Sequence, residues 1–306
     1  MKVAVISPLF SRSLALKNEL EHFFSDVKYN TDNTLKTKAD IITFLHDIDA
    51  AIVGREEIDD EILGACPKLK ILSRYGVGLD NIDVDALKRH DVKLGWTGGT
   101  NSNSVAELTL FLMLGLIRNT YTTSTLLKQH VWKVNGGMEL TGKTIGLFGF
   151  GNIAKRVVEL LKPFGCTILV SNRTQSEEDA QKYGITFAEK AHILQEADII
   201  SIHLPLNAES KNRFSTAEFE AMKPTGYIVN TARGGIIDEE ALKVALTTGQ
   251  IAGAGLEAFL EEPTHDWELI DLPNLICLPH VGGNSKESIL GMGRACITHL
   301  REFYHL

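Results

Sequence analysis

The chain contains a strand-like run that leads through glycines into a helix start, Thr144-Ile-Gly-Leu-Phe-Gly-Phe-Gly-Asn-Ile-Ala154. An apolar run of strand length ends at a glycine-rich turn, and the turn leads directly into a helix-like segment. In such a unit Gly149 permits the tight turn, Gly151 lets the backbone approach a pyrophosphate, and Ala154 keeps helix and strand close. The helix N-terminus adds amide donors and a partial positive charge. The stretch therefore predicts dinucleotide binding, against the alternative of a glycine-rich turn in an unrelated sheet.

Short apolar, β-branched runs alternate with amphipathic segments along almost the whole chain, which is the rhythm of parallel α/β sheets. The expected strands form two series, 3–7, 50–53 and 70–74, then 144–148, 167–171, 198–202, 227–230, 252–257 and 275–278. The polar stretch 98–104 separates the two series, and the last helix, 285–306, has no strand after it. We expect an α/β protein of two doubly wound parallel-sheet domains. A Rossmann coenzyme domain at 101–283 is inserted in a flavodoxin-like substrate domain at 1–100 and 284–306.

The composition is that of an ordinary soluble protein. The chain has 306 residues, a formal net charge of −8 and four cysteines. The negative charge argues against nucleic acid and against a membrane surface as partners. The cysteines show no C-x-x-C spacing, so no metal site is expected and a reducing, cytoplasmic location is favoured. The apolar run 108–117 is about half a membrane span and is expected to be a buried helix.

The strand at 167–171 ends with residues that bear on the choice of cofactor. An acid that binds the adenosine ribose is expected there, but the chain continues Asn172-Arg173-Thr174. An acid would repel a 2′-phosphate, since two like charges about 4 Å apart at an effective dielectric near 20 cost roughly 4 kcal/mol. Asn172 lacks that repulsion and Arg173 can pair with the phosphate. NADP(H) is therefore preferred over NAD(H), and the alternative is that Arg173 is a solvated loop charge.

Three polar residues, Arg233, Glu262 and His280, follow later strands of the second series. The carboxyl ends of parallel strands line the ligand crevice of an open sheet, so these side chains can converge there. A histidine exchanges protons near neutral pH, a carboxylate on its other ring nitrogen fixes the tautomer, and a guanidinium binds a carboxylate. The set predicts hydride transfer at C2 of a small 2-hydroxy acid. Taken singly, a core histidine, a solvated acidic run and a surface arginine are the alternatives.

Nearly the whole chain resembles the D-isomer-specific 2-hydroxyacid dehydrogenases, most closely their D-3-phosphoglycerate dehydrogenase branch. The matching segments are 74–83, 104–107, 139–144 with the glycine turn, 203–206, and those around Arg233, Glu262 and His280. The resemblance implies that these three residues are the catalytic triad of an NAD(P)-dependent oxidoreductase acting on CH–OH donors. It also implies that amides in the turn Gly76-Val77-Gly78 hold the substrate carboxylate. A closing cleft and a homodimer are further implications.

The glycine-rich turn and the family resemblance together predict which residues bind the cofactor. These residues are Gly149, Phe150, Gly151, Asn152, Ile153, Asn172, Arg173, Thr174, His203, Leu204, Pro205, Thr231, Ala232, Arg233, Glu257, His280 and Gly282. Glu257 stands where the family usually has an aspartate that contacts the nicotinamide amide. Because glutamate is one methylene longer, the position of the nicotinamide ring is expected to shift.

The substrate is a small 2-keto or 2-hydroxy acid whose identity the sequence leaves open. Arg55 and Arg74 fall at positions that resemble phosphate-binding arginines of the phosphoglycerate branch. Glu56 and Glu57 would oppose a phosphate beside Arg55, so a surface ion pair is an equal interpretation of that arginine. Glyoxylate or hydroxypyruvate reduction with NADPH is the alternative, which the Asn172 loop favours.

Two other classes of function also remain open. One is a dinucleotide-sensing, co-repressor-like interaction module, and the presence of Arg233, Glu262 and His280 argues against it. The other is a hydrolase that retains NAD, and the missing ribose acid argues against it.

Overall fold

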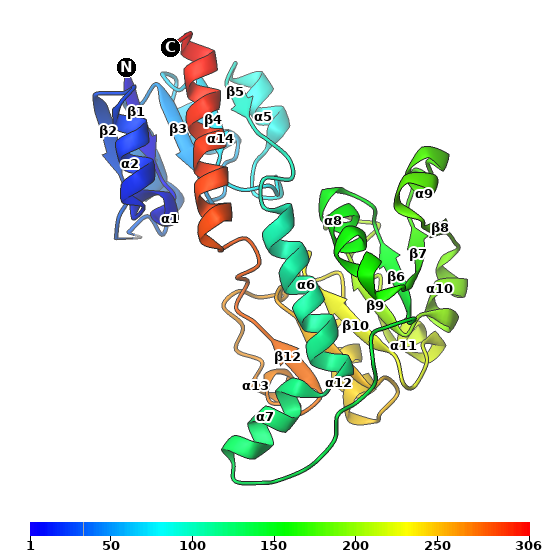
Figure 1. The fold of residues 1–306 in the computed structure, drawn as a ribbon. Helices are drawn as coiled ribbons and strands as arrows, with labels where there is room; N and C mark the ends of the chain where they lie inside the picture. The colour runs from blue at the N-terminus through cyan, green and yellow to red at the C-terminus, as the bar shows by residue number, and fades with distance from the viewer. Residues whose placement is uncertain (33) are drawn as a thin grey trace. The chain divides into compact units, whose positions relative to one another are not determined.

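The computed structural model describes residues 1–32 and 34–306 (Figure 1). The described residues form two compact units, one from Met1–Asn101 with Gly283–Leu306 and the other from Ser102–Gly282. Each unit is built on one sheet in which neighbouring strands run parallel, with helices between them in sequence. The prediction of an α/β protein with two doubly wound parallel sheets is confirmed.

The first unit contains a five-stranded sheet in the order β2-β1-β3-β4-β5. Its strands are β1 (Lys2–Val5), β2 (Asp26–Tyr29), β3 (Ala50–Val53), β4 (Ile71–Arg74) and β5 (Lys93–Gly95). Its helices are α1 (Pro8–Ser11), α2 (Leu14–Glu21), α3 (Lys38–Leu45), α4 (Asp60–Ala65), α5 (Val84–Arg89) and α14 (Lys286–Tyr304). This strand order is that of flavodoxin-like sheets. The edge strands β2 and β5 were not predicted.

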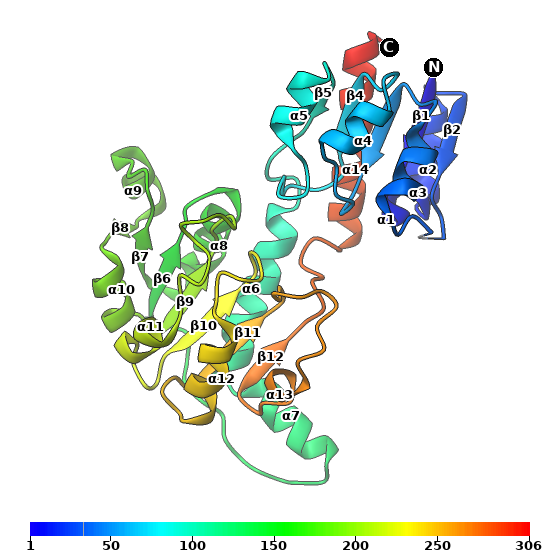
Figure 2. The same ribbon diagram turned by 180° about the vertical axis from the view of Figure 1, so that it is seen from behind.

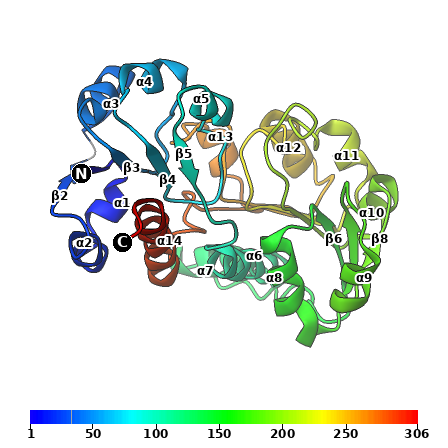
Figure 3. The same ribbon diagram turned by 90° about the horizontal axis from the view of Figure 1, so that it is seen from above.

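Both faces of this first sheet are covered (Figure 3). Helices α3, α4 and α5 pack on one face through apolar side chains such as Leu45 and Ile62. Helices α1, α2 and α14 pack on the other face, where Leu16 and Cys296 are buried. A Cβ at Gly293 would lie 2.3 Å from Leu16 Cδ1, so a glycine is what lets α14 approach α2 this closely.

The second unit contains a seven-stranded sheet in the order β12-β11-β10-β9-β6-β7-β8. Its strands are β6 (Thr144–Phe148), β7 (Thr167–Ser171), β8 (Thr186–Phe187), β9 (Ile199–Ile202), β10 (Tyr227–Asn230), β11 (Gly253–Leu256) and β12 (Leu275–Cys277). The strand order reverses between β6 and β9. In a doubly wound sheet that reversal is where ligands bind, at the carboxyl ends of the strands.

Helices cover both faces of the second sheet (Figures 2 and 3). They are α6 (Ser102–Ile117), α7 (Thr120–Lys128), α8 (Asn152–Leu161), α9 (Glu177–Tyr183), α10 (Lys190–Glu196), α11 (Thr216–Ala221), α12 (Glu239–Thr247) and α13 (Trp267–Ile270). The expected buried helix lies in α6, where Leu112 and Leu116 are buried and Phe111 is 51% exposed. Strand β11 carries Gly255, and a Cβ there would already touch Leu112, so the strand leaves room for α6.

Within residues 1–32 and 34–306, no helix has the length and apolar character that a membrane crossing requires. The same residues contain no cluster of three or more histidine, cysteine or acidic side chains arranged to hold a metal ion.

Candidate active site

The turn after β6 requires glycine at its first position. Gly149 has a φ of +93°, in the region that favours glycine. A Cβ there would lie 2.4 Å from the carbonyl oxygen of His203, and the Gly149 N–H donates to Ser171 O at 2.9 Å. The turn is thereby held between the ends of β7 and β9. A side chain at residue 149 would force these strands apart.

The start of α8 has the properties of an anion site. Gly151 is its N-cap residue, and a Cβ at Gly151 would meet no atom within 4 Å. No side chain of the described residues caps the helix, and its first turn contains no acidic residue. The amides at the start of α8 therefore face open space with a partial positive charge. These features fit the pyrophosphate of a dinucleotide, which Gly151, Asn152 and Ile153 would hold.

The loop after β7 carries Asn172, Arg173 and Thr174. The Asn172 side-chain amide donates to the Thr174 carbonyl at 2.6 Å, which closes a tight loop. Arg173 and Thr174 are exposed, so both side chains are available to a ligand. Acidic residues follow in the first turn of α9, where Asp179 pairs with Lys155 of α8 at 2.9 Å. The loop thus presents a cation and amide donors where ribose-binding acids usually stand.

His203-Leu204-Pro205 follows β9 beside the glycine turn. Burial lowers the pKa of His203 to about 4, so its imidazole is neutral at pH 7. Its Nε2 lies 3.0 Å from the Ser201 hydroxyl. His203 is therefore a neutral residue whose ring is hydrogen-bonded to Ser201 and whose backbone carbonyl lies close to Gly149.

The turn after β10 is built by Asn230. The Asn230 side chain accepts from the Ala232 N–H at 3.0 Å and donates to the Arg233 carbonyl at 2.8 Å. The Arg233 guanidinium donates to the Ala232 carbonyl at 2.8 Å through one Nη. The Thr231 hydroxyl lies 2.9 Å from that of Thr109 on α6. The backbone that carries Arg233 is thus fixed by side chains, and no role for Asn230 or Thr109 was predicted from the sequence.

His280 and Glu262 form a direct pair at the carboxyl ends of β11 and β12. The Nδ1 atom of His280 lies 2.8 Å from each carboxylate oxygen of Glu262. Glu262 also accepts from the Phe259 N–H at 3.2 Å, which orients the carboxylate. The two side chains are 28% and 27% exposed, so the pair is open to solvent. With Nδ1 bonded to the carboxylate, Nε2 is the ring atom able to exchange a proton with a ligand.

Glu257 lies at the end of β11 and is 2% exposed. Its carboxylate accepts from the Gly282 N–H at 2.7 Å. Burial raises the pKa of Glu257, whereas the charge of His280 and the amides of Gly282 and Val281 lower it. The Gly282 carbonyl in turn accepts from the Ser104 hydroxyl. Ser104 belongs to a segment that the sequence analysis matched without giving it a role.

The turn 76–78 follows β4 in the first unit. Its carbonyls are held by side chains: Arg74 Nε donates to Gly78 O at 2.7 Å, and Trp96 Nε1 donates to Val77 O at 2.9 Å. Gly76 has a φ of +142°, which again favours glycine. Throughout the part of the chain that the structure describes, no protein group accepts from the amides of residues 76–78. The turn therefore offers backbone donors of the kind that bind anions.

Arg74 and Arg55 differ in their surroundings. Arg74 is 8% exposed, and it bonds the Gly78 carbonyl and, at 3.4 Å, the Tyr75 carbonyl. Arg55 is exposed, and the neighbouring Glu56 carboxylate accepts from the Gly54 N–H at 2.7 Å. Arg74 thus stabilises the turn 76–78 through its hydrogen bond to the Gly78 carbonyl.

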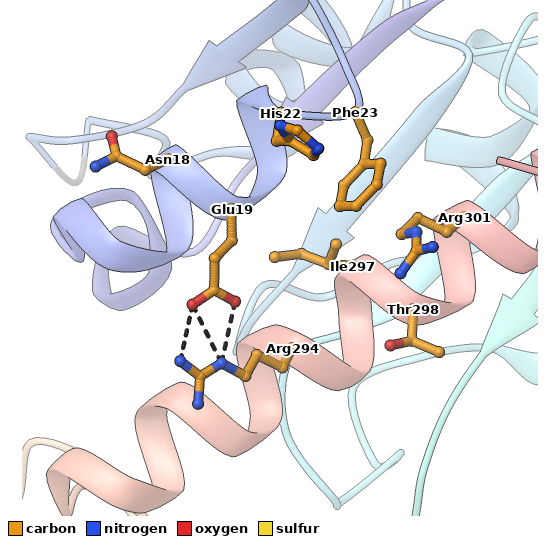
Figure 4. A pocket seen from close by; sticks show the side chains of 8 residues that line it. All are labelled: Asn18, Glu19, His22, Phe23, Arg294, Ile297, Thr298 and Arg301. Carbon is orange, nitrogen blue, oxygen red and sulfur yellow. Dashed lines mark hydrogen bonds and ion pairs between the residues drawn. The ribbon is translucent and has the colours of Figure 1, made fainter.

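A surface cavity of about 600 Å³ lies between α2 and α14 in the first unit. Figure 4 shows that Glu19 and Arg294 face each other across it, and their closest approach is 2.8 Å. The lining also includes Asn18, His22, Phe23, Ile297, Thr298 and Arg301. None of the site residues expected from the sequence lines this cavity.

Comparison with known proteins agrees with this geometry. Residues 110–282 match the family model described as D-isomer specific 2-hydroxyacid dehydrogenase, NAD binding domain. A glyoxylate reductase of Thermococcus litoralis is 31% identical over 290 residues, covering 92% of this chain and 88% of that protein. A D-3-phosphoglycerate dehydrogenase of Methanocaldococcus jannaschii is 34% identical over 292 residues, covering 94% of this chain and 54% of that longer protein.

A solved structure is also similar over the full length. It is an acyclic imino acid reductase in complex with NADPH and D-arginine, with a TM-score of 0.89 and 25% identity, covering 100% of this chain and 97% of that one. The family resemblance stated from the sequence is confirmed, and so is a nicotinamide dinucleotide as cofactor. The chain belongs to the D-isomer specific 2-hydroxyacid dehydrogenases, NAD(P)-dependent oxidoreductases that act on the CH–OH group of small hydroxy acids.

Proposed function

We propose that the chain is an NADPH-dependent reductase of a short, unphosphorylated 2-keto acid such as glyoxylate or hydroxypyruvate. The observation that carries the chemistry is the pair formed by His280 and Glu262, with both carboxylate oxygens 2.8 Å from Nδ1. A bound reduced nicotinamide supplies the hydride for C2 of the substrate. The work left to the protein is to supply a proton and to hold the substrate.

His280 supplies the proton in this proposal. Glu262 stabilises the protonated imidazole and keeps Nε2 directed away from the carboxylate. As negative charge develops on the C2 oxygen, Nε2–H donates its proton to that oxygen. The ring then keeps a single proton on Nδ1, toward Glu262, and regains the other from solvent because the pair is partly exposed. Such acid catalysis typically contributes about 100- to 10,000-fold to the rate.

Arg233 and the turn 76–78 hold the substrate in this proposal. The Arg233 guanidinium has a fixed fork of donors suited to a carboxylate and to the polarised C2 oxygen. The backbone of Arg233 is fixed by the Asn230 side chain, which supports a preorganised clamp. The unpaired amides of residues 76–78 would bind the substrate carboxylate.

The surroundings of Arg74 favour a substrate without a phosphate. Of the two candidate phosphate ligands, Arg74 is the better sequence match, and its guanidinium bonds the Gly78 and Tyr75 carbonyls. These bonds direct two of the five guanidinium donors toward the turn, and Arg74 is 8% exposed, so little of its side chain is accessible to a phosphate. Arg55 has Glu56 and Glu57 beside it, whose charges oppose a phosphate. A phosphorylated keto acid remains the second candidate because D-3-phosphoglycerate dehydrogenases are among the similar proteins.

The loop after β7 favours NADPH over NADH. The exposed Arg173 can pair with a 2′-phosphate, and Asn172 places no charge against it. The similar imino acid reductase holds NADPH, which is in line with this choice.

We also propose that the protein is a homodimer. The segment from α7 to residue 138 exposes large apolar side chains, with Leu127 at 54%, Trp132 at 81% and Val134 at 88%. Such a stretch is typical of a surface that a second copy covers. Light scattering should give twice the chain mass for the protein and the chain mass for Trp132→Glu. A monomeric unaltered protein would contradict the proposal.

A turnover screen tests the proposed function. NADPH and NADH oxidation are followed with glyoxylate, hydroxypyruvate, pyruvate and 3-phosphohydroxypyruvate. Turnover of an unphosphorylated acid with NADPH supports the proposal, and turnover confined to 3-phosphohydroxypyruvate favours the second candidate. No turnover with any acid, despite NADPH binding, would contradict both.

A further inference from the structure

The segment that carries His280 is held at its far end by two side chains. The Gly282 N–H donates to Glu257 at 2.7 Å, and the Gly282 carbonyl accepts from the Ser104 hydroxyl. Glu257 follows β11, and Ser104 lies in the first turn of α6. Both backbone polar groups of Gly282 are therefore bonded to side chains of other elements, which fixes the chain two residues beyond His280.

The backbone at His280 needs such support. His280 has a φ of +52°, and its N–H donates to Leu278 O at 3.0 Å. A non-glycine residue in the left-handed region is strained and persists where the surrounding structure imposes it. Glu262 holds only the ring of His280, through Nδ1. The backbone conformation must be imposed by contacts elsewhere in the segment.

The contact between Glu257 and Gly282 is close enough to exclude any side chain at residue 282. A Cβ on Gly282 would lie 2.3 Å from Oε1 and 2.9 Å from Cδ of Glu257. The Glu257 side chain is buried, so its bond to the amide is shielded from water. Glycine at residue 282 and glutamate at residue 257 thus form one fitted contact.

We propose that Glu257 is a positioning residue, whose carboxylate fixes the backbone at Gly282 and so determines where His280 presents its imidazole. The inference rests on the proton-donor role proposed above for His280. The length of the side chain matters, because an aspartate would end about 1.5 Å short. The 2.7 Å bond to Gly282 would then exceed hydrogen-bonding distance unless the backbone moved. This role differs from the nicotinamide contact that the family resemblance implies for an aspartate at this position.

Two substitutions at residue 257 separate the effect of side-chain length from the effect of side-chain charge. Glu257→Gln keeps the length and an accepting oxygen, and Glu257→Asp keeps the charge and loses the reach. A misplacement of about 1 Å at a reacting group can cost as much as about 100-fold in rate. We expect kcat to fall at least about tenfold further in Glu257→Asp than in Glu257→Gln. In both variants the Kd for NADPH, measured by fluorescence titration, should change by less than about threefold.

Two outcomes of these kinetics would overturn the inference. Loss of kcat in Glu257→Gln with normal kcat in Glu257→Asp would mean that the charge of Glu257 matters and its reach does not. A rise in the Kd for NADPH that parallels the loss of kcat would mean that Glu257 acts on the cofactor. His280→Ala is measured alongside. If His280→Ala retained turnover, the proton-donor role itself would fail, whereas loss in His280→Ala with normal turnover in Glu257→Asp would overturn this inference alone.

A double-mutant cycle tests the fitted contact without using activity. Gly282→Ala is introduced into the unaltered chain and into Glu257→Asp, and the urea midpoint of each protein is measured. Because the shorter side chain makes room for the new Cβ, the alanine should lower the midpoint less in the Glu257→Asp background. If Gly282→Ala alone does not fold, recovery of a cooperative transition in the double variant is the same result. Equal shifts in both backgrounds would contradict the contact.

Discussion

The Nδ1 atom of His280 lies 2.8 Å from both carboxylate oxygens of Glu262, although 18 residues separate them in the chain. This pairing leaves Nε2 as the ring nitrogen that can serve a substrate. It also explains why the two residues follow different strands: the parallel sheet brings the carboxyl ends of β11 and β12 to one edge. Proton donation by His280, as proposed, depends on this pairing.

Replacing His280 should abolish turnover and spare cofactor binding. Asparagine tolerates the left-handed backbone at φ +52°, so His280→Asn keeps the fold while removing the proton donor. We expect kcat to fall by about 100- to 10,000-fold. The Kd for NADPH should stay within about threefold, since the pyrophosphate site at α8 is separate. His280→Ala is the matched variant, and parallel loss of NADPH binding and turnover in both would argue against the assignment.

Replacing Asn172 should change the choice of cofactor. Asn172→Asp places a carboxylate where the 2′-phosphate of NADPH is expected, and its repulsion costs up to about 4 kcal/mol. The ratio of kcat/KM for NADPH over NADH should fall at least about tenfold. Arg173→Gln is the control that removes the cation without adding an acid. In this variant the ratio of kcat/KM for NADPH over NADH should fall less than in Asn172→Asp. An unchanged ratio in Asn172→Asp would show that the loop does not contact the 2′ position.

The two turn glycines should respond differently to alanine. Gly149→Ala places a Cβ 2.4 Å from the His203 carbonyl at a φ of +93°, so it should lower the free energy of unfolding by at least about 2 kcal/mol. The new Cβ in Gly151→Ala would meet no atom within 4 Å, so the free energy of unfolding should change by less than about 0.5 kcal/mol. Only Gly151→Ala should keep the fold while weakening NADPH binding. Urea unfolding and a fluorescence titration check both, and normal NADPH affinity in Gly151→Ala would remove the pyrophosphate from this turn.

His203 should make stability fall at acid pH. Its pKa is lowered to about 4 by burial, whereas an unfolded histidine titrates near 6.5. Between these values the unfolded chain takes up a proton that the folded chain does not. The free energy of unfolding should therefore fall, by at most about 1.4 kcal/mol per pH unit from this group, as pH drops from 6.5 to 4.

His203→Gln is the control for this pH dependence, because glutamine can still bond the Ser201 hydroxyl and does not titrate. Its urea-unfolding profile should be flatter than that of the unaltered protein over the same range. Identical slopes would mean that His203 is solvated in the folded state.

The architecture was predictable because long buried strands leave a clear pattern. The strands β6 and β10 are mostly apolar and buried, and the glycine turn follows the first strand of the second sheet. The edge strand β2 was missed because its residues are alternately exposed and half-buried, and β8 was missed because it has only two residues. Edge strands lack the apolar run on which such a prediction depends.

The local geometry of the candidate site could not be predicted from the sequence. Residue type and position identified His280 and Glu262 as candidate catalytic residues. Their pairing depends on a left-handed backbone at His280 that no sequence pattern encodes. The sequence predicts Arg74 as a phosphate ligand and Glu257 as a cofactor contact, and both stay predictions. The bonds of Arg74 to the Gly78 and Tyr75 carbonyls, and of Glu257 to the Gly282 amide 25 residues away, depend on the folded backbone.

The ratio of kcat/KM for hydroxypyruvate over 3-phosphohydroxypyruvate with NADPH distinguishes the two candidate substrates, because they differ only by the phosphate. We expect a ratio of at least about 10, with NADPH also preferred over NADH. A ratio of about one tenth or less would contradict the proposed substrate class and make the phosphorylated keto acid the preferred substrate.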